Sequence, residues 1–334
     1  MVEKKLLIFH QGALGDFVLT FPALLRLKKH FTPIDAVCKP QLGELAKGLG
    51  LIENWFSQDA ARFASFFSDS IDTDVINLLN TYGEIILFSF SKDLAQSINQ
   101  IRHHKVHRIS PRPNPTDNIH VAVHLLKNLA RCGLIAIDND LNSSEQSLLY
   151  MGQRVFNDTL HSRKVLLHPG AGSKKKMWPI TNFLQVERRL ESDGYTPEYI
   201  MGPADEFLKG ELRAAGALQT VVHTPENLAA LITLMKTAGG YIGNDSGVSH
   251  LVAYLGLPTV AVFGPSDPGM WRPIGPRVQI VRPSFHGAAG METHRKNSDS
   301  PDCFAEITPA IVLDAFYKIV SQEKRMAGSS RVKR

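Results

Sequence analysis

The stretch YIGNDSGVSHLVAYLGLPTVAVFGPSDP, residues 241–268, alternates short apolar runs with a helical pattern. The apolar run 241–244 leads into a polar loop, the pattern of residues 246–256 is helical, and a second apolar run covers 258–264. Strands that alternate with helices in this way are typical of a parallel sheet with helices on its faces. This stretch therefore predicts an α/β fold.

The same alternation continues along the rest of the chain. In the first half the strand candidates are Leu6–Phe9, Ala36–Cys38, Glu84–Phe88 and Val106–Ile109, and the helix candidates are Phe21–Phe31, Leu42–Gly48, Leu94–Arg102 and Ile119–Arg131. In the second half we expect strands over 164–168 and 195–202 and helices over 182–194, 228–240 and 305–322. Thr181 is the expected N-cap of the first of these helices.

The length of 334 residues exceeds most single hydrophobic cores and suggests two domains. The polar, irregular segment from Ile137 to Arg163 is the expected boundary. We therefore predict a Rossmann-like N-terminal domain over 1–160, a second such domain over 161–322, and a basic, flexible tail over 323–334. Two similar α/β domains favour a ligand site in a crevice between them, beyond the carboxyl ends of the strands.

Charge and cysteine content narrow the function classes. A net charge of +5 fits an anionic ligand or a membrane surface and is too small to indicate a nucleic-acid partner. The cysteines, Cys38, Cys132 and Cys303, lie far apart and predict reduced thiols in a cytoplasmic protein. The N-terminus does not read as a signal peptide, and the longest apolar stretch, 250–264, is too short to span a bilayer.

Two loops of the second half carry features of an anion site. A helix that begins near Ser246 offers free N–H groups and a positive dipole end, and Gly247 lets a ligand approach, which favours a diphosphate. An ordinary helix cap by Asp245 or Ser246 explains the same residues equally well. In HPGAGSKKKMWP, residues 168–179, glycines and lysines suit phosphate oxygens, whereas a solvated lysine run is the alternative. The neighbouring Trp178 favours Lys176 as one anchored lysine.

Two further loops contain carboxylates after a predicted strand. In MGPADE, residues 201–206, the acids could accept hydrogen bonds from a ribose, but local chemistry favours acids that complement a helix dipole. In HQGALGDFVLTFPAL, residues 10–24, a strand, a glycine turn and a helix follow the order of a phosphate loop. Asp16 would repel a phosphate there, so this loop needs another explanation.

Together, these four loops, in this order, resemble the ADP-heptose:lipopolysaccharide heptosyltransferases, glycosyltransferase family 9. The resemblance extends from Lys5 to about Val320, and residues 241–268 are its most specific part. It implies a GT-B fold of two Rossmann-like domains, with the acceptor on the first and the nucleotide sugar on the second. It also implies an inverting transfer from ADP-heptose to a lipopolysaccharide core sugar, with no bound metal or other cofactor.

The resemblance assigns roles to individual residues. Gly12 and Gly15 would let the acceptor approach, and Asp16 would be the general base, although Asp16 as a helix cap is the alternative. Lys176 would stabilise the leaving diphosphate. Glu206 would bind the ribose, and Asp245 would bind donor hydroxyls or shape the loop. The full set expected to bind the donor is Gly170, Ser173, Lys176, Glu206, Asp245, Ser246, Gly247 and His250, with His250 as a packing or hydrogen-bonding residue rather than a catalyst.

Some features leave the substrates open. The first domain shows no run of arginines for a phosphorylated acceptor, and residues 284–303 match no pattern. The alternatives are therefore a transferase of the same fold that uses another nucleotide sugar on a different glycan or protein, and a non-catalytic nucleotide-sugar-binding module. A dinucleotide oxidoreductase is disfavoured, because GALGD lacks the GxGxxG pattern. The acidic triplets at 72–74 and 138–140 and the histidine cluster at 102–108 favour turns and surface rather than metal sites.

The location follows from the same resemblance. A cytoplasmic enzyme of lipopolysaccharide assembly would work at the inner face of the inner membrane. The basic tail 323–334 is expected to be solvated, and peripheral contact with an anionic membrane surface is its alternative role.

Overall fold

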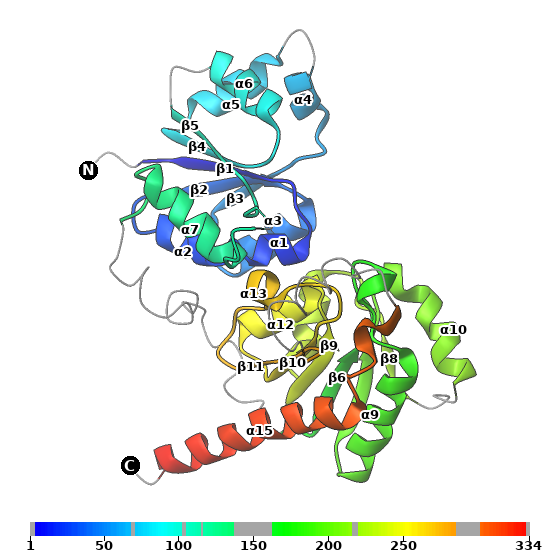
Figure 1. Ribbon diagram of the computed structural model, residues 1–334. Helices are drawn as coiled ribbons and strands as arrows, with labels where there is room; N and C mark the ends of the chain where they lie inside the picture. The colour runs from blue at the N-terminus through cyan, green and yellow to red at the C-terminus, as the bar shows by residue number, and fades with distance from the viewer. Residues whose placement is uncertain are drawn as a thin grey trace. The chain divides into compact units, whose positions relative to one another are not determined.

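The computed structural model describes residues 4–67, 71–101, 105–114, 116–136, 162–215, 220–284 and 301–331. The chain divides into two compact units, Met1–Met151 and Gly152–Arg334. Each unit contains one parallel sheet with helices on its faces, as Figure 1 shows. The predicted α/β fold class is confirmed. The expected boundary between residues 160 and 161 lies outside the described residues.

The first unit contains a five-stranded parallel sheet in the order β3-β2-β1-β4-β5. Its strands are β1 (Leu6–His10), β2 (Ile34–Cys38), β3 (Asn54–Ser57), β4 (Glu84–Phe88) and β5 (Lys105–Ile109). Its helices are α1 (Leu14–Val18), α2 (Phe21–Leu27), α3 (Pro40–Gly48), α4 (Ala61–Ala64), the 3₁₀ turn η1 (Ser65–Phe67), α5 (Thr73–Asn80), α6 (Lys92–Ile101) and α7 (Val121–Arg131).

The central strands of this sheet are apolar on both faces because helices cover both. Every residue of β1 is buried, and so is every residue of β2. One apolar cluster joins β1 and β4 to α4, α5 and α6, and α1, α2 and α7 cover the opposite face in Figure 1. Continuous apolar runs are the signature of such strands.

The second unit contains a six-stranded parallel sheet in the order β11-β10-β9-β6-β7-β8. Its strands are β6 (Lys164–His168), β7 (Thr196–Ile200), β8 (Val222–His223), β9 (Gly240–Asn244), β10 (Thr259–Val262) and β11 (Val278–Val281). Its helices are η4 (Lys174–Lys176), α9 (Ile180–Ser192), η5 (Pro203–Asp205), α10 (Glu206–Ala214), α11 (Leu228–Met235), α12 (Gly247–Leu255), α13 (Pro268–Trp271), η6 (Pro301–Phe304) and α15 (Pro309–Arg331).

The strand order fixes where a ligand can bind in each unit. In both sheets the first strand of the unit lies in the interior, with the second strand on one side and the fourth on the other. The loops after the first and fourth strands therefore lead to opposite faces, which leaves a crevice at their carboxyl ends. These switch points lie between β1 and β4 in the first unit and between β6 and β9 in the second.

Several expected boundaries differ from the structure. Helix α9 begins at Ile180, with Pro179 as its N-cap, so Thr181 lies inside the helix and its expected capping role is wrong. Pro179 has a non-helical backbone (φ −49°, ψ 133°) and Ile180 is the first helical residue, so the helix starts two residues earlier than it would with a threonine cap at 181. Helix α15 continues to Arg331, into the segment that we expected to be a flexible tail. Among the helices that the structure describes, none is both long and apolar enough to cross a membrane.

Candidate functional site

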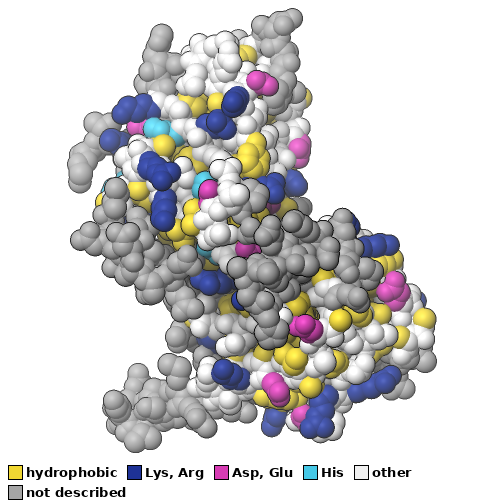
Figure 2. Space-filling view, viewed as in Figure 1, with side chains coloured by type: hydrophobic (Ala, Val, Ile, Leu, Met, Phe, Trp, Pro, Cys, Tyr) yellow, Lys and Arg dark blue, Asp and Glu magenta, His cyan; other side chains and the backbone are white. Residues whose placement is uncertain are grey.

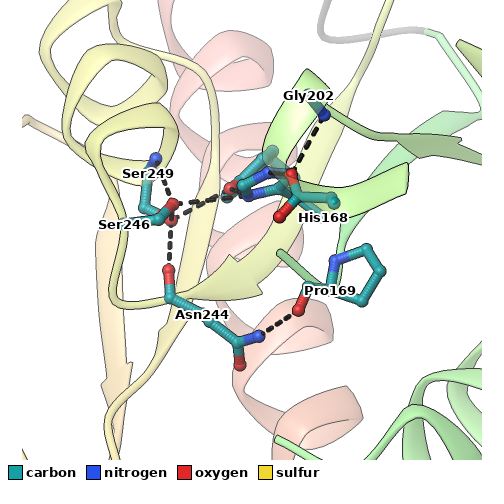
Figure 3. Close-up of polar contacts among 8 residues, drawn as sticks. His168, Pro169, Gly202, Asn244, Ser246 and Ser249 are labelled. Carbon is teal, nitrogen blue, oxygen red and sulfur yellow. Dashed lines mark hydrogen bonds and ion pairs between the residues drawn. The ribbon is translucent and has the colours of Figure 1, made fainter. Parts of the chain in front are cut away.

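The switch point of the second unit brings two loops together. Parallel pairing of β6 with β9 places His168, the last residue of β6, opposite Gly243. The side chain of Asn244 then joins the loops that follow. Its Nδ2 donates to the Pro169 carbonyl at 2.7 Å, as drawn in Figure 3, and its Oδ1 accepts from the Trp178 backbone N–H at 3.1 Å. The glycine- and lysine-containing loop after β6 is therefore held against the end of β9.

Lys176 and Asp245 form the charged pair of this site. Lys176 Nζ lies 2.7 Å from Asp245 Oδ2, and the Asp245 side chain is only 5% exposed. Burial alone would raise the pKa of Asp245, but the nearby His250 imidazole and the Lys176 ammonium outweigh it and lower that pKa to about 2. The ammonium has three N–H donors. Lys176 can therefore hold Asp245 and still donate to a ligand.

The three lysines of the run 174–176 differ in their burial and contacts. Lys174 and Lys175 are exposed, and Lys174 Nζ lies over the Phe207 ring, 4.6 Å from its centre. Lys176 is partly buried beside Trp178, whose ring is almost fully enclosed. The expectation of one anchored lysine next to a packed tryptophan is confirmed by this geometry.

The N-terminus of α12 forms the other side of the site. Ser246 is its N-cap, and its Oγ accepts from the Ser249 N–H at 3.3 Å. The capping role considered from the sequence is therefore present. A cap satisfies only part of a helix N-terminus, so the N–H groups of Gly247 and Val248 remain directed out of the first turn. His250, one turn along, is 3% exposed and lies 3.9 Å from Asp245 Oδ1.

A buried imidazole that the sequence analysis missed lies between these loops. His168 is 4% exposed, and its Nδ1 is 3.2 Å from the Tyr241 hydroxyl and 3.3 Å from Ser246 Oγ (Figure 3). Its Nε2 lies 3.5 Å from Asp205 Oδ2. A histidine that ends an apolar strand, before a glycine loop, was the available signal.

The acids of MGPADE point in different directions. Asp205 is buried, accepts from the Gly202 N–H at 3.0 Å and faces Gly170, where any side chain would overlap its carboxylate. Burial would raise the Asp205 pKa, but His168 and the Gly202 N–H lower it below its ordinary value. Glu206 is exposed and pairs with Lys209 on its own helix at 2.8 Å. Glu206 as the ribose ligand stays a prediction, as does Ser173, which is exposed.

The switch point of the first unit contains a pocket. It has a volume of about 310 Å³, which is at the lower end for small-molecule sites. The loops after three adjacent strands, β1, β4 and β5, form it. Its lining residues are His10, Gln11, Gly12, Asp16, Phe88, Ser89, Phe90, Ser91, Pro111 and Arg112.

Asp16 belongs to this pocket and also caps α1. Its Oδ2 accepts from the Ala13 N–H at 3.2 Å, so the capping alternative is observed. Asp16 Oδ1 has no partner within the described part of the chain. A Cβ at Gly12 would lie 2.8 Å from Asp16 Cβ and 2.8 Å from His10 Cε1, so only glycine fits between them. Gly15 lies within α1, beside Asp16.

His10 supplies a neutral ring next to Asp16. Burial lowers its pKa to about 4, against the opposing effect of the Asp16 charge. Its Nδ1 faces the Gly12 N–H at 3.3 Å, which suits a neutral imidazole that accepts this hydrogen bond. The ring also contacts Phe17 edge-on, 4.9 Å between ring centres. His10 therefore shapes the pocket without adding charge near Asp16 at neutral pH.

The rim of the pocket carries an aromatic ring and a guanidinium group. Phe90 is 54% exposed, and the Arg112 guanidinium lies over its ring, 5.2 Å from the centre. Arg108 NH1 reaches the Phe90 carbonyl at 3.5 Å. Arg112 has no carboxylate partner among the described residues. The sequence analysis found no arginine run in this unit and so missed a basic group that the fold brings to the pocket.

The acidic triplets and the histidine cluster have structural roles where they are described. Asp72 caps α5 by accepting from the Asp74 N–H at 2.8 Å, and His107 pairs with Glu84 at 2.8 Å between neighbouring strands. The triplet 138–140 lies outside the described residues. Among the residues that are described, no group of three or more His, Cys, Asp and Glu side chains could hold a metal ion.

Charged side chains are distributed over the surface. On the face drawn in Figure 2, the described Lys and Arg side chains form several separate groups, with acidic groups between some of them. Among the described residues, each candidate site contains a single such basic side chain rather than a basic patch. It is Lys176 in the second unit and Arg112 in the first.

Both units have the strand order of nucleotide-binding α/β proteins, and together they form the GT-B fold class. The chain belongs to glycosyltransferase family 9 (heptosyltransferase), whose family model matches residues 76–299, about two thirds of the chain. This match contains the loops of the second unit and begins after the loop with Asp16.

Individual relatives agree with the family. Lipopolysaccharide heptosyltransferase 2 of Salmonella typhimurium is 26% identical over 163 residues, 46% of this chain and 46% of that protein. Lipopolysaccharide heptosyltransferase 3 of Escherichia coli K12 is 25% identical over 289 residues, 78% and 82% of the two chains. Several of the curated relatives are matched over about half of their length or less. The solved structure of E. coli ADP-heptose lps heptosyltransferase II superposes with a TM-score of 0.72 at 17% identity, over 96% of this chain and 99% of that one.

The Asp245→Asn variant should lose stability that depends on pH. The Asp245 pKa of about 2 is lower than the ordinary value of 3.8, so ionisation stabilises the fold above pH 3.8 and this contribution disappears as the pH falls towards 2. It amounts to roughly 2 kcal/mol at 1.36 kcal/mol per pKa unit. Urea unfolding from neutral pH down to the acid limit measures it.

The difference in free energy of unfolding between wild type and Asp245→Asn should shrink below pH 3.8. Glu206→Gln, at an exposed carboxylate, is the control and should change the free energy of unfolding little. A difference that is the same at every pH would contradict the stabilising role of the Asp245 charge.

Proposed function

We propose that this chain transfers heptose from ADP-heptose to a lipopolysaccharide core sugar, with inversion and without a metal ion. The observation that carries the proposal is that the two units present different chemical groups at their switch points. One has a pocket with a carboxylate, and the other has a loop and helix N-terminus suited to a diphosphate. The names of the relatives support heptose, ADP and lipopolysaccharide. Cys38, Cys132 and Cys303 form no disulfide, which suits the expected cytoplasmic location.

The donor half rests on the second unit. The first-turn N–H groups of α12 and the spare N–H donors of Lys176 can bind the oxygens of a diphosphate. Gly170 lies against the Asp205 carboxylate, which keeps the loop after β6 close to the sheet. Asp245 holds Lys176 in position, and Glu206 and Ser173 are the proposed contacts to the rest of the donor.

The acceptor half rests on the first unit. Asp16 offers a carboxylate oxygen without a partner among the described residues, in a pocket whose rim presents the Phe90 ring and the Arg112 guanidinium, which has no carboxylate partner in the same part of the chain. An aromatic face suits the C–H groups of a sugar, and a guanidinium suits a carboxylate or phosphate. We therefore propose that the acceptor sugar binds with an anionic group at Arg112 and a hydroxyl at Asp16.

In this mechanism Asp16 accepts a hydrogen bond from the acceptor hydroxyl and takes its proton as that oxygen attacks the anomeric carbon. The bond from this carbon to the diphosphate oxygen breaks on the opposite face, so the configuration inverts. The electron pair leaves with ADP, and Lys176 and the N-terminus of α12 stabilise the added negative charge. These protein groups can supply the positive charge that a metal ion would otherwise supply.

Nucleotide titration tests the donor half. We expect ADP to bind about tenfold or more tightly than UDP, GDP or CDP, with equal affinity in magnesium and in chelator. Lys176→Gln should weaken ADP binding about tenfold, because one charge-assisted contact is lost. The matched control, Lys174→Gln, changes a neighbouring exposed lysine and should bind ADP like wild type.

Other results of this titration would redirect the proposal. Preference for UDP or GDP would keep the fold and replace the donor. ADP binding without transfer to any core sugar would favour a non-catalytic nucleotide-sugar-binding module. Loss of ADP affinity in chelator would contradict the metal-independent mechanism.

Replacement of Asp16 tests the acceptor chemistry. Asp16→Asn keeps a side-chain oxygen that can accept from the Ala13 N–H but removes the base. We expect kcat to fall by about 10²–10⁴. ADP affinity should stay unchanged, because the proposed donor groups belong to the other unit. Steady-state transfer assays and ADP titration measure the two effects, and a variant that keeps most of its kcat would rule out Asp16 as the base.

The rim of the pocket should control acceptor affinity. Arg112→Gln should raise the KM for the acceptor about tenfold or more and change kcat less, because it removes a binding contact away from the reacting oxygen. Phosphate-stripped and carboxyl-reduced core acceptors show which anion Arg112 binds. Arg131→Gln, at an exposed arginine that ends α7, is the control. Unchanged KM values for all acceptors would contradict the role of Arg112.

A further inference from the structure

The polar groups between β6, β9 and α12 form a closed set of hydrogen bonds. His168 Nδ1 lies within 3.3 Å of both the Tyr241 hydroxyl and Ser246 Oγ (Figure 3). Ser249 Oγ donates to the Asn244 carbonyl at 2.5 Å and lies 2.9 Å from the Tyr241 hydroxyl. Tyr241, Ser249 and His168 are all buried, so each hydroxyl proton needs an acceptor inside this set.

The protons of this set can be assigned from the neighbours. Asp205 is a carboxylate and faces Nε2 of His168, so a neutral imidazole carries its proton on Nε2 and leaves Nδ1 as an acceptor. Burial raises the pKa of Tyr241, so the phenol keeps its proton. The proton of Ser249 is already directed at the Asn244 carbonyl.

Two hydroxyl protons then remain, on Tyr241 and Ser246, and two acceptors, His168 Nδ1 and Ser249 Oγ. Each hydroxyl lies within hydrogen-bond distance of both acceptors, because Ser246 Oγ is also 3.2 Å from Ser249 Oγ. The two hydroxyl groups can therefore swap the acceptors to which they donate. If the Ser246 hydroxyl donates its hydrogen bond to a ligand instead, the Tyr241 hydroxyl can turn to donate to His168 Nδ1, so this buried acceptor keeps a partner.

We propose that His168 and Asp205 are positioning residues of the donor site, and that Tyr241 releases the Ser246 hydroxyl for a diphosphate oxygen by replacing it at His168. The inference rests on the proposed donor site and gives roles to three residues of the motif loops, His168, Asp205 and Tyr241, that were not among the expected donor residues. Asp205 fixes the imidazole and fills the space beside Gly170, so the pair holds the glycine loop and the helix cap together.

The backbone leaves little room for Tyr241 to lie elsewhere. A Cβ at Gly243 would overlap the Tyr241 hydroxyl, so the absence of a side chain at residue 243 lets the phenol reach His168. The ring itself is fully buried. The hydroxyl can turn its proton while the ring stays in place, which is the motion that the proposal needs.

The same unit contains matched pairs that lack these links. His223 pairs with Glu198 at 2.7 Å, and Tyr199 donates to Glu187 at 2.8 Å. Among the described residues, the polar partners of these side chains are one another, Lys164 and Thr220, none of which belongs to the loop after β6 or to the first turn of α12. They provide controls for the loss of an imidazole–carboxylate pair and for the loss of a buried tyrosine hydroxyl.

The experiment combines ADP titration with hydrogen exchange on the whole 334-residue chain. Tyr241→Phe should weaken ADP binding about tenfold, the value of one hydrogen bond of about 1.4 kcal/mol. Ser246→Ala should weaken ADP binding by the same factor. The double variant should lose no more ADP affinity than either single variant, because without the Tyr241 hydroxyl Ser246 keeps donating its hydrogen bond to His168. Tyr199→Phe should bind ADP like wild type.

Hydrogen exchange tests the positioning pair without a ligand. His168→Gln should speed amide exchange in residues 169–176 and 246–249, whereas His223→Gln should leave both segments unchanged. Equal exchange in the two variants would overturn the positioning role of His168. Additive losses of ADP affinity from Tyr241→Phe and Ser246→Ala would contradict the proposal that Tyr241 replaces Ser246 as the donor to His168.

Different results would contradict the proposed donor site and the proposed role of Tyr241. If the wild-type chain binds no ADP, the proposed donor site fails and the role of Tyr241 fails with it, while exchange in His168→Gln still decides whether His168 holds the loops. If wild type binds ADP and Tyr241→Phe binds it equally well, the donor site stands and the role of Tyr241 is wrong.

Discussion

The parallel pairing of β6 with β9 is the constraint on which the candidate donor site depends. It places His168 opposite Gly243 and lets Asn244 bond to Pro169, a residue 75 positions away in the chain. Each later feature uses this alignment. Lys176 reaches Asp245 because the two loops are joined, and Ser246 reaches His168 because α12 begins where β9 ends. A one-residue slip would reverse the side chains of the whole strand and remove all of these contacts.

The sequence predicted the fold class, the loops and most strands because these depend on local periodicity and turn residues. It missed β3, β8 and β11, whose half-exposed or short runs carry a weak apolar signal. It also missed His168 and Tyr241, and it considered Asp205 only as a ribose acceptor or a helix-dipole acid, because the roles of these side chains lie in contacts between β6, β9 and η5. Arg112 was missed for the same reason, since only the order β1-β4-β5 brings it to the pocket.

The two units use the same architectural position in different ways. His10 ends β1 and His168 ends β6, each before a glycine-containing loop at a switch point. The Nδ1 of His10 faces a backbone N–H of its own loop and leaves Asp16 free to meet a ligand. The Nδ1 of His168 faces side chains of a second strand and a helix. The same position in the fold therefore carries a pocket with a carboxylate in one unit and a buried polar network in the other.

The charge of the proposed donor site is smaller than its lysine run implies. Two of the three lysines are exposed, and the third is paired with Asp245, so the pair carries little net charge before a ligand binds. Attraction of a diphosphate then depends more on the oriented N–H groups of α12 than on the number of lysines. Asp245 compensates by keeping Lys176 in one place, because an ammonium that is already ordered loses less side-chain entropy when it meets a phosphate. Asp245 would also lie close to a diphosphate bound at this proposed site, so its distance from that ligand, set by Asn244 and the first turn of α12, would decide whether the pair favours or opposes binding.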